Sequence, residues 1–300
     1  MTTYLGELAA LSTSVLWALT SILFTLAGQR AGSRVVNRTR LIFATLFLSI
    51  AHLFIQGTLF PTNIGVERLG WLALSAIVGL IIGDGLLFYA YTQIGPRLSM
   101  LMMALSPIMG TLLAWMYLDE TMHIEQLIAI LVTISGVGWV VMKRQELDTE
   151  PETSKNYVLG ILCGLGGGFG QAIGLILSKQ GMTGDFSTLS ASLIRVTSAM
   201  ITIWIIAAAR RQVKPTIQAL QDTRALKLIT AGSLVGPTLG MTLSLVAVQT
   251  SQVGIASTLM SLSPIFLLPL SRLIFQEQID LRAIAGTIVA MVGVAMLFLA

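Results

Sequence analysis

Asp84 is a carboxylate deep inside an apolar stretch, between Gly83 and Gly85 and about eight residues from Ala76 or Thr92. Ionisable groups in such surroundings are costly and usually face a cavity or a partner. Apolar surroundings also favour the neutral carboxyl group, which suits a group that takes up and releases a proton. We therefore expect Asp84 to bind an amine of a solute or to carry a coupling proton. The alternative is that it hydrogen-bonds freed backbone or pairs with a polar group across a helix bundle.

Two further pairs of side chains are candidates for contact with the same solute. Phe88 and Tyr91 follow Asp84 at i+4 and i+7 on one helical face, where aromatic rings beside a carboxylate form a cation-binding corner. Ordinary packing, with Tyr91 at the membrane interface, is the alternative. Trp17 and Gln171 fall less than a turn apart in register when Gly6 and Gly160 are matched. They form a second candidate contact, with simple interhelical hydrogen bonding as the alternative.

A short motif occurs twice, at 105–108 and 262–265, where the sequence reads Leu-Ser-Pro-Ile at an offset of 157 residues. Each proline removes a backbone donor and kinks its helix, which predicts a hinge or a cavity wall. A static kink is the alternative. The four residues concerned are Ser106, Pro107, Ser263 and Pro264. A glutamate follows each proline by thirteen residues, at Glu120 and Glu277, where we expect it to cap a helix or pair with a nearby base.

The composition is that of a membrane protein. Of 300 residues, 55% are hydrophobic and 11% charged, and the mean hydropathy is +0.84. That leaves too little polar surface for a soluble chain of this length. The net charge of +4 comes from Lys and Arg in short connectors, so no nucleic-acid partner is expected. The single cysteine, Cys163, can form no internal disulfide.

Spans of about 20 apolar residues divide the chain into ten expected helices. The second is short, and an earlier start, before Arg40, is an alternative. The segments are approximately 5–27, 41–56, 69–92, 96–118, 124–142, 157–178, 189–209, 225–248, 254–275 and 281–299. A charged linker, 143–156, separates a first repeat, 1–142, from a second, 157–300. Five helices per repeat require the two repeats to cross the membrane in opposite directions, so we predict an all-α protein of two inverted repeats.

Lys and Arg in the connectors predict the orientation. Fifteen lie on one side, from Arg30 to Arg282, against Arg68 and Lys179 on the other. The positive-inside rule therefore places both termini outside the cytoplasm. Arg40 and Arg195 begin the second helix of each repeat, and we expect them to be anchors that reach the membrane surface. The alternative is that an arginine at a cavity mouth attracts a solute carboxylate.

These features together resemble the EamA type of the drug/metabolite transporter superfamily. The resemblance rests on the two Leu-Ser-Pro-Ile motifs with Glu120 and Glu277, the closing glycines near 136 and 293, and the arginine near the start of each second helix. It implies a ten-helix secondary carrier, often an exporter of amino acids or related compounds, with a cavity between the repeats. Members are often drawn with both termini in the cytoplasm, which the charge count contradicts.

Other classes of function are weighed against this resemblance. An enzyme lacks support, because only His52 and His123 are histidines and the sequence contains neither a His-Glu-x-x-His pattern nor a nucleophile with an evident base. No P-loop, cofactor motif or metal-ligand cluster is found. A channel or a receptor remains an alternative to a carrier. We expect an inner or plasma membrane carrier of a small solute working by alternating access, with proton coupling as an option and the oligomeric state undecided.

Overall fold

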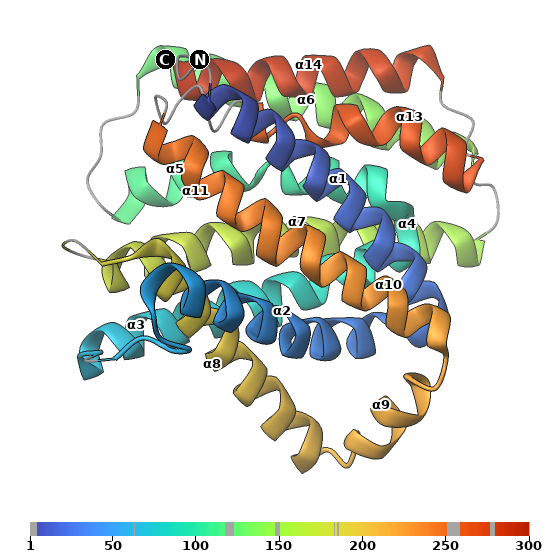
Figure 1. The fold of residues 1–300 in the computed structure, drawn as a ribbon. Coiled ribbons are helices and arrows are strands. Elements are labelled where there is room, and N and C mark those ends of the chain that lie inside the picture. Colours follow the sequence, from blue (N-terminus) through green and yellow to red (C-terminus); the bar gives the residue numbers. More distant parts are fainter. Residues whose placement is uncertain are drawn as a thin grey trace.

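The computed structural model describes residues 5–62, 64–117, 123–147, 151–182, 184, 186–250, 259–276 and 280–299, and no β-strand occurs among them. The chain is an all-α polytopic membrane protein (Figure 1). Its helices are α1 (Leu5–Ala31), α2 (Ser33–Gln56), α3 (Val66–Ala76), η1 (Ile77–Gly83), α4 (Asp84–Met103), α5 (Ser106–Tyr117), α6 (Ile124–Leu147), α7 (Pro151–Gly181), α8 (Thr188–Ala209), α9 (Val213–Ala219), α10 (Thr223–Ser233), η2 (Leu234–Gly240), α11 (Met241–Thr250), α13 (Ser263–Phe275) and α14 (Leu281–Leu299).

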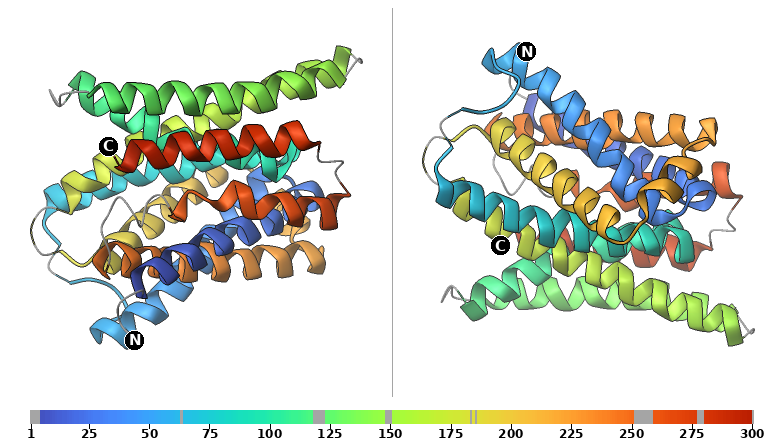
Figure 2. Two further views of the ribbon diagram at one scale, coloured as in Figure 1. Left: turned by 90° about the horizontal axis from the view of Figure 1, so that it is seen from above. Right: turned by 90° about the horizontal axis from the view of Figure 1, so that it is seen from below.

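Seven of the described helical stretches are long and apolar enough to cross a membrane, and two shorter apolar helices, 263–275 and 281–297, accompany them. The longest stretch, Val66–Met103, contains α3, η1 and α4. It bends at Gly95, where φ is 76° and Pro96 follows. A residue with a side chain rarely adopts this φ, so Gly95 is suited to the turn between the third and fourth expected spans. The start of α1 and the end of α14 lie at the same end of the bundle (left in Figures 1 and 2).

The second helix begins earlier than Leu41, so the alternative start before Arg40 is confirmed. Gly32, with a φ of 87°, ends α1, and α2 starts at Ser33 directly afterwards. The added turns contain Arg38 and Arg40, which are only 8% and 5% exposed, and Arg97 in α4 is 6% exposed. These three arginines are therefore buried helix residues and not connector residues. A hydrophobicity pattern does not predict this helix start, because the stretch is polar. Buried partners make its charges tolerable there.

The region of the expected linker is partly helical. Helix α6 continues to Leu147, and α7 begins at Pro151. A proline is well placed at the first helical position, because the missing N–H has no partner in the helix there.

The two repeats share an irregularity at equivalent positions. The π-helices η1 and η2 each cover seven residues, and a shift of 157 superimposes Ile77 on Leu234 and Gly83 on Gly240. A π-helix has an i→i+5 hydrogen-bond pattern, so its junctions with an α-helix free backbone carbonyls for other partners. In η2, Pro237 lacks a donor, and the Thr238 hydroxyl donates to the Ser233 carbonyl oxygen at 3.0 Å. Both repeats therefore interrupt the α-helical hydrogen-bond pattern at the same place.

Helices of one repeat pack mainly against those of the other. Helix α1 contacts α10, η2 and α11, and reciprocally α7 contacts α3, η1 and α4. Helices α2 and α8 form a further pair, as do α6 and α14. Figure 2 shows α6 and α14 side by side at one edge of the bundle. This reciprocal pairing brings the first, second, third and fifth spans of each repeat against the other repeat.

An exposed ion pair joins α1 to the start of α10. The Arg30 Nε lies 2.7 Å from an Asp222 carboxylate oxygen, and Asp222 caps α10 by accepting from the backbone N–H groups of Arg224 and Ala225. The hydrogen bond from Arg30, followed by the bond from Ala225, lowers the pKa of Asp222 below its ordinary 3.8.

This lowered pKa predicts a dependence of stability on pH. A carboxyl group with a depressed folded-state pKa stabilises the fold above its unfolded pKa, and the contribution is lost as the pH falls through the lower folded value. We expect the thermal stability of the wild type to exceed that of Asp222→Asn at pH 7 and the difference to shrink below about pH 4. Asparagine retains the cap. Melting curves in detergent at several pH values measure this, and a difference that is constant with pH would contradict the assignment.

Candidate functional site

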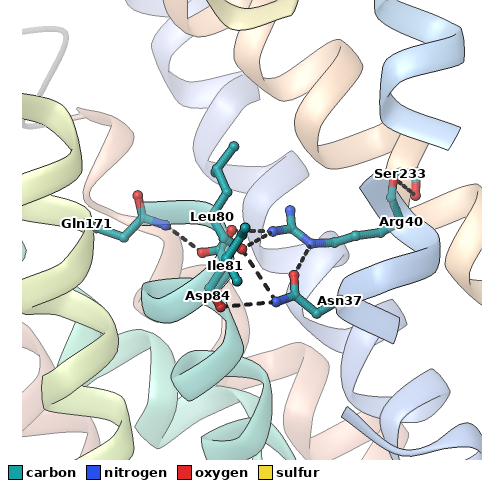
Figure 3. Close-up of polar contacts among 7 residues, drawn as sticks. All are labelled: Asn37, Arg40, Leu80, Ile81, Asp84, Gln171 and Ser233. Carbon is teal, nitrogen blue, oxygen red and sulfur yellow. Dashed lines mark hydrogen bonds and ion pairs between the residues drawn. The ribbon is translucent and has the colours of Figure 1, made fainter. Parts of the chain in front are cut away.

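The central polar cluster is built around an ion pair between Arg40 of α2 and Asp84 at the start of α4 (Figure 3). Both residues are buried, at 5% and 6% exposure. Arg40 lies seven residues into α2, roughly 10 Å from its start at the helical rise of 1.5 Å per residue. Arg40 neutralises the charge that the burial of Asp84 would otherwise leave uncompensated. The alternative in which Asp84 pairs with a polar group across the bundle therefore describes this state.

The backbone of η1 supplies the remaining acceptors of the cluster. The Asn37 amide donates to the carbonyl oxygens of Leu80 and Ile81 at 3.4 Å, and Arg40 also donates to Leu80 O at 3.4 Å. The Arg40 Nε donates to Asn37 Oδ1 at 3.0 Å. The π-helix thus exposes carbonyls one turn before Asp84, and α2 turns a polar face toward them. The Ser233 hydroxyl bonds to the Arg40 carbonyl oxygen and ties the cluster to α10.

Gln171 reaches Asp84 from the second repeat. Its side-chain amide donates to the Asp84 oxygen that Arg40 does not bind (Figure 3). Glycines make this approach possible: a Cβ on Gly170 would lie 2.8 Å from the Gly83 Cα, and one on Gly174 would lie 3.0 Å from the Gly79 Cα. Helix α7 and η1 therefore meet with their backbones nearly in contact, as small residues allow in membrane helices. The cluster joins both repeats.

Phe88 and Tyr91 extend the cluster on the same face of α4. The Arg40 guanidinium lies 4.7 Å from the centre of the Phe88 ring, so the cation on this ring belongs to the protein itself. Phe88 also packs on Phe24 and Tyr91, with ring centres 5.1 and 5.5 Å apart. The Tyr91 hydroxyl bonds to the Met100 sulfur at 3.2 Å, and its ring is buried. The two rings pack behind the ion pair.

Trp17 lies against the other π-helix. A Cβ on Gly240 of η2 would be 3.1 Å from Cδ1 and Nε1 of the Trp17 indole. The neighbouring Met241 is the equivalent of Asp84 after the 157-residue shift. Trp17 and Gln171 thus occupy corresponding places in the two halves. Trp17 lies against Gly240, the neighbour of Met241, and Gln171 donates a hydrogen bond to Asp84.

Arg195 of α8 points to the same region from the second repeat. Its Nη2 would lie 3.6 Å from a Cβ on Gly79, and the Asp84 charge acts on its guanidinium. Its Nε is buried without a hydrogen-bond partner in the described part of the chain. The expectation that Arg40 and Arg195 are surface anchors is therefore wrong: both extend toward η1. Two features of the sequence could have indicated this burial. Arg40 and Arg195 each lie near the start of the second helix of their repeat, and the polar Asn37 lies one turn before Arg40.

The Ser-Pro motifs mark two breaks in the helices. Helix α4 ends at Met103, and α5 begins with Ser106 and Pro107; in the second repeat α13 begins with Ser263 and Pro264. Each proline sits in the first turn of a new helix, where it displaces no hydrogen bond, so it does not kink a continuous one. The Ser263 hydroxyl donates to the Ser14 carbonyl oxygen of α1 at 3.0 Å. Glu120 and Glu277 lie outside the described residues.

Comparison with known proteins agrees with this architecture. None of the curated proteins matches the chain. One crystal structure aligns over 97% of this chain and 94% of its own with a TM-score of 0.61, and at 15% identity it shows a similar fold alone. The EamA-like transporter family matches residues 4–142 and again 158–299. Because these two matches cover nearly the whole sequence, the chain belongs to the EamA-like transporter family of the drug/metabolite transporter superfamily.

Proposed function

We infer that the chain is a secondary carrier that moves an amino acid or a related small metabolite across the membrane by alternating access. The observation that carries this proposal is the polar cluster around Asp84, which joins α2 and α4 of the first repeat to α7 and α10 of the second. Buried polar groups in membrane helices mark solute pathways, and carriers with inverted repeats bind their solute between the repeats. Asp84 and Gln171 are the proposed solute contacts, with Phe88, Tyr91 and Trp17 as the surrounding apolar wall.

The breaks before Ser106 and Ser263 are the proposed hinges for rocking between the two states. Each lies where a helix stops for two residues and restarts at a Ser-Pro pair. Such interruptions let one segment turn relative to the next without breaking a continuous hydrogen-bond ladder. We propose export from the cell as the direction, on the grounds of the family's common activity.

The proposed location is the inner or plasma membrane, with both termini outside the cytoplasm. Removing the buried Arg38, Arg40 and Arg97 from the count leaves the same side with the large majority of Lys and Arg. Labelling of single cysteines placed near each terminus with a membrane-impermeant reagent in whole cells tests the orientation. Labelling only after lysis would reverse it.

Proton coupling is proposed as a change of partner for Asp84. In this state the carboxylate is bound by Arg40 and Gln171. Protonation of Asp84 weakens its contact with Arg40, because a neutral carboxyl group loses its attraction to the guanidinium. Coupling therefore demands a second conformation in which Asp84 leaves Arg40.

Uptake into proteoliposomes tests the function. A pooled amino-acid and metabolite library is offered to vesicles containing wild type or Asp84→Asn, with and without an imposed pH gradient. We expect saturable uptake by the wild type and a loss of about tenfold or more in the variant, since a buried charged hydrogen bond contributes about 1.5–3 kcal/mol. Dependence on the pH gradient supports coupling.

Counterflow separates a carrier from a channel. Preloaded unlabelled solute should accelerate entry of labelled solute through a carrier, and a pore gives no such acceleration. Equal uptake by wild type and Asp84→Asn would leave a carrier with Asp84 in a structural role. A lack of uptake of every solute would return the channel and receptor alternatives.

A further inference from the structure

We propose that Arg195 is the binding group for the carboxylate of the transported solute, with Gln171 Oε1 receiving the neighbouring amine. The assignment rests on the proposed carrier function and names the chemistry that the site recognises: α-amino acids and close relatives that carry both groups.

Arg195 is the second-repeat counterpart of Arg40, but its surroundings differ. Arg40 has a carboxylate partner in Asp84, whereas the position equivalent to Asp84 in the second repeat is Met241, which cannot balance a charge. In this state each oxygen of Asp84 accepts a hydrogen bond, one from Arg40 and the other from Gln171. The cluster therefore holds two guanidinium groups and one carboxylate.

An arginine in this state suits a carboxylate ligand. Arg195 lies seven residues into α8, roughly 10 Å from its start, so its charge is expensive without a partner. Its buried Nε has no hydrogen-bond partner in the described residues. The guanidinium is a planar fork of N–H donors that matches a carboxylate with two parallel bonds. An incoming carboxylate would neutralise the surplus charge and satisfy this donor.

Gln171 supplies the complementary group at the same place. Its amide nitrogen is committed to Asp84, which leaves Oε1 as an acceptor. A Cβ on Gly79 would lie 3.6 Å from both Arg195 Nη2 and the Gly174 Cα and 3.8 Å from Gln171 Oε1, so a donor and an acceptor lie beside the same point of η1. An α-amino acid presents its carboxylate and ammonium on one carbon, and this pairing matches the two protein groups.

Paired probes test the assignment. Each L-amino acid in the uptake pool is compared with its amide, in which the carboxylate is a neutral carboxamide and the rest is unchanged. We expect the wild type to prefer the acids by about tenfold to a hundredfold, the range for a hydrogen bond to a charged group. Arg195→Gln should abolish the preference, and Arg195→Lys should retain part of it. Arg210→Gln, which removes a positive charge at the exposed end of α8, is the matched control and should behave as wild type.

Gly79→Ala gives a second, independent variant. The added methyl meets its nearest neighbours at 3.6 Å, an ordinary contact, so the fold should be retained while the space between Arg195 and Gln171 is filled. We expect Gly79→Ala to bind the acids more weakly, because its methyl group lies between Arg195 and Gln171, and to keep a melting temperature within a few degrees of wild type.

Two outcomes separate this inference from the carrier function. Saturable transport with equal use of acids and amides, or an acid preference that survives Arg195→Gln, overturns the role of Arg195 and leaves the carrier intact. Absence of transport for all solutes overturns the carrier function. The same acid and amide pairs are then measured by direct binding to detergent-solubilised protein: a preference abolished by Arg195→Gln supports the site, and equal binding overturns it.

Discussion

Gly136→Ala is expected to destabilise the protein by about 1–3 kcal/mol, the usual range for overpacking, whereas Gly138→Ala in the same helix should be neutral or stabilising. A Cβ on Gly136 would lie 2.4 Å from the Ala290 backbone nitrogen and 2.7 Å from the Gly286 carbonyl oxygen of α14. These are main-chain atoms, so relief requires α6 and α14 to separate. The reciprocal glycine, Gly293, is as tight: its Cβ would lie 2.5 Å from the Thr133 backbone nitrogen.

Gly138 is the matched control for this prediction. Nothing lies within 4 Å of the place that a Cβ on Gly138 would take, so alanine adds no clash and removes the flexibility of a helical glycine, a gain of about 0.5–1 kcal/mol. Unfolding by SDS from mixed micelles gives both free energies. Equal stabilities for Gly136→Ala and Gly138→Ala would show that α6 and α14 do not approach this closely in the membrane.

Breaking the ion pair between Arg40 and Asp84 should have the largest effect of all. Arg40→Met leaves Asp84 as a buried carboxylate, and Asp84→Leu leaves Arg40 unpaired; either change is expected to cost about 3–5 kcal/mol, as for other buried pairs. The double variant removes both charges, and apolar replacements of a buried pair are often neutral. It should therefore be more stable than either single variant.

The two single variants and the double variant form a thermodynamic cycle. Free energies of unfolding from SDS titration give the coupling between the sites, and additive losses would mean that the two side chains do not interact. Arg210→Gln, at the exposed end of α8, controls for removal of a positive charge and should change stability by less than about 0.5 kcal/mol.

Much of the architecture could be predicted because the duplication records it twice. The 157-residue shift, the Ser-Pro motifs and the closing glycines near 136 and 293 indicate the fold, and the breaks before Ser106 and Ser263 lie where the motifs do. Asp84 could be predicted as a site residue because a carboxylate amid apolar residues has a high free-energy cost unless it faces a cavity or a partner. The π-helices could not be predicted, since their hydrogen-bond shift leaves no residue pattern beyond glycine.

The burial of the arginines was harder to predict, because hydrophobicity reflects the cost of burying a charge and not the partners that offset this cost. Arg40 looked like an end residue when its helix was placed from Leu41 onward, whereas α2 begins at Ser33 and buries it. Which face of α2 meets η1 is decided by tertiary packing. The pairing of Gln171 with Asp84 likewise depends on contact between glycines of α7 and η1, which are distant in sequence.

The two π-helices are alike, but only the first is followed by an acid, Asp84, where the second is followed by Met241. The π-helix is therefore present in both repeats, whereas the ion pair between Asp84 and Arg40 is present in only the first. In the proposed carrier, a rocking step that breaks this ion pair would have no counterpart in the opposite step, so the two end states would differ in energy. We expect such a carrier to favour one end state, and its apparent affinity for the solute to differ between the two faces of the membrane.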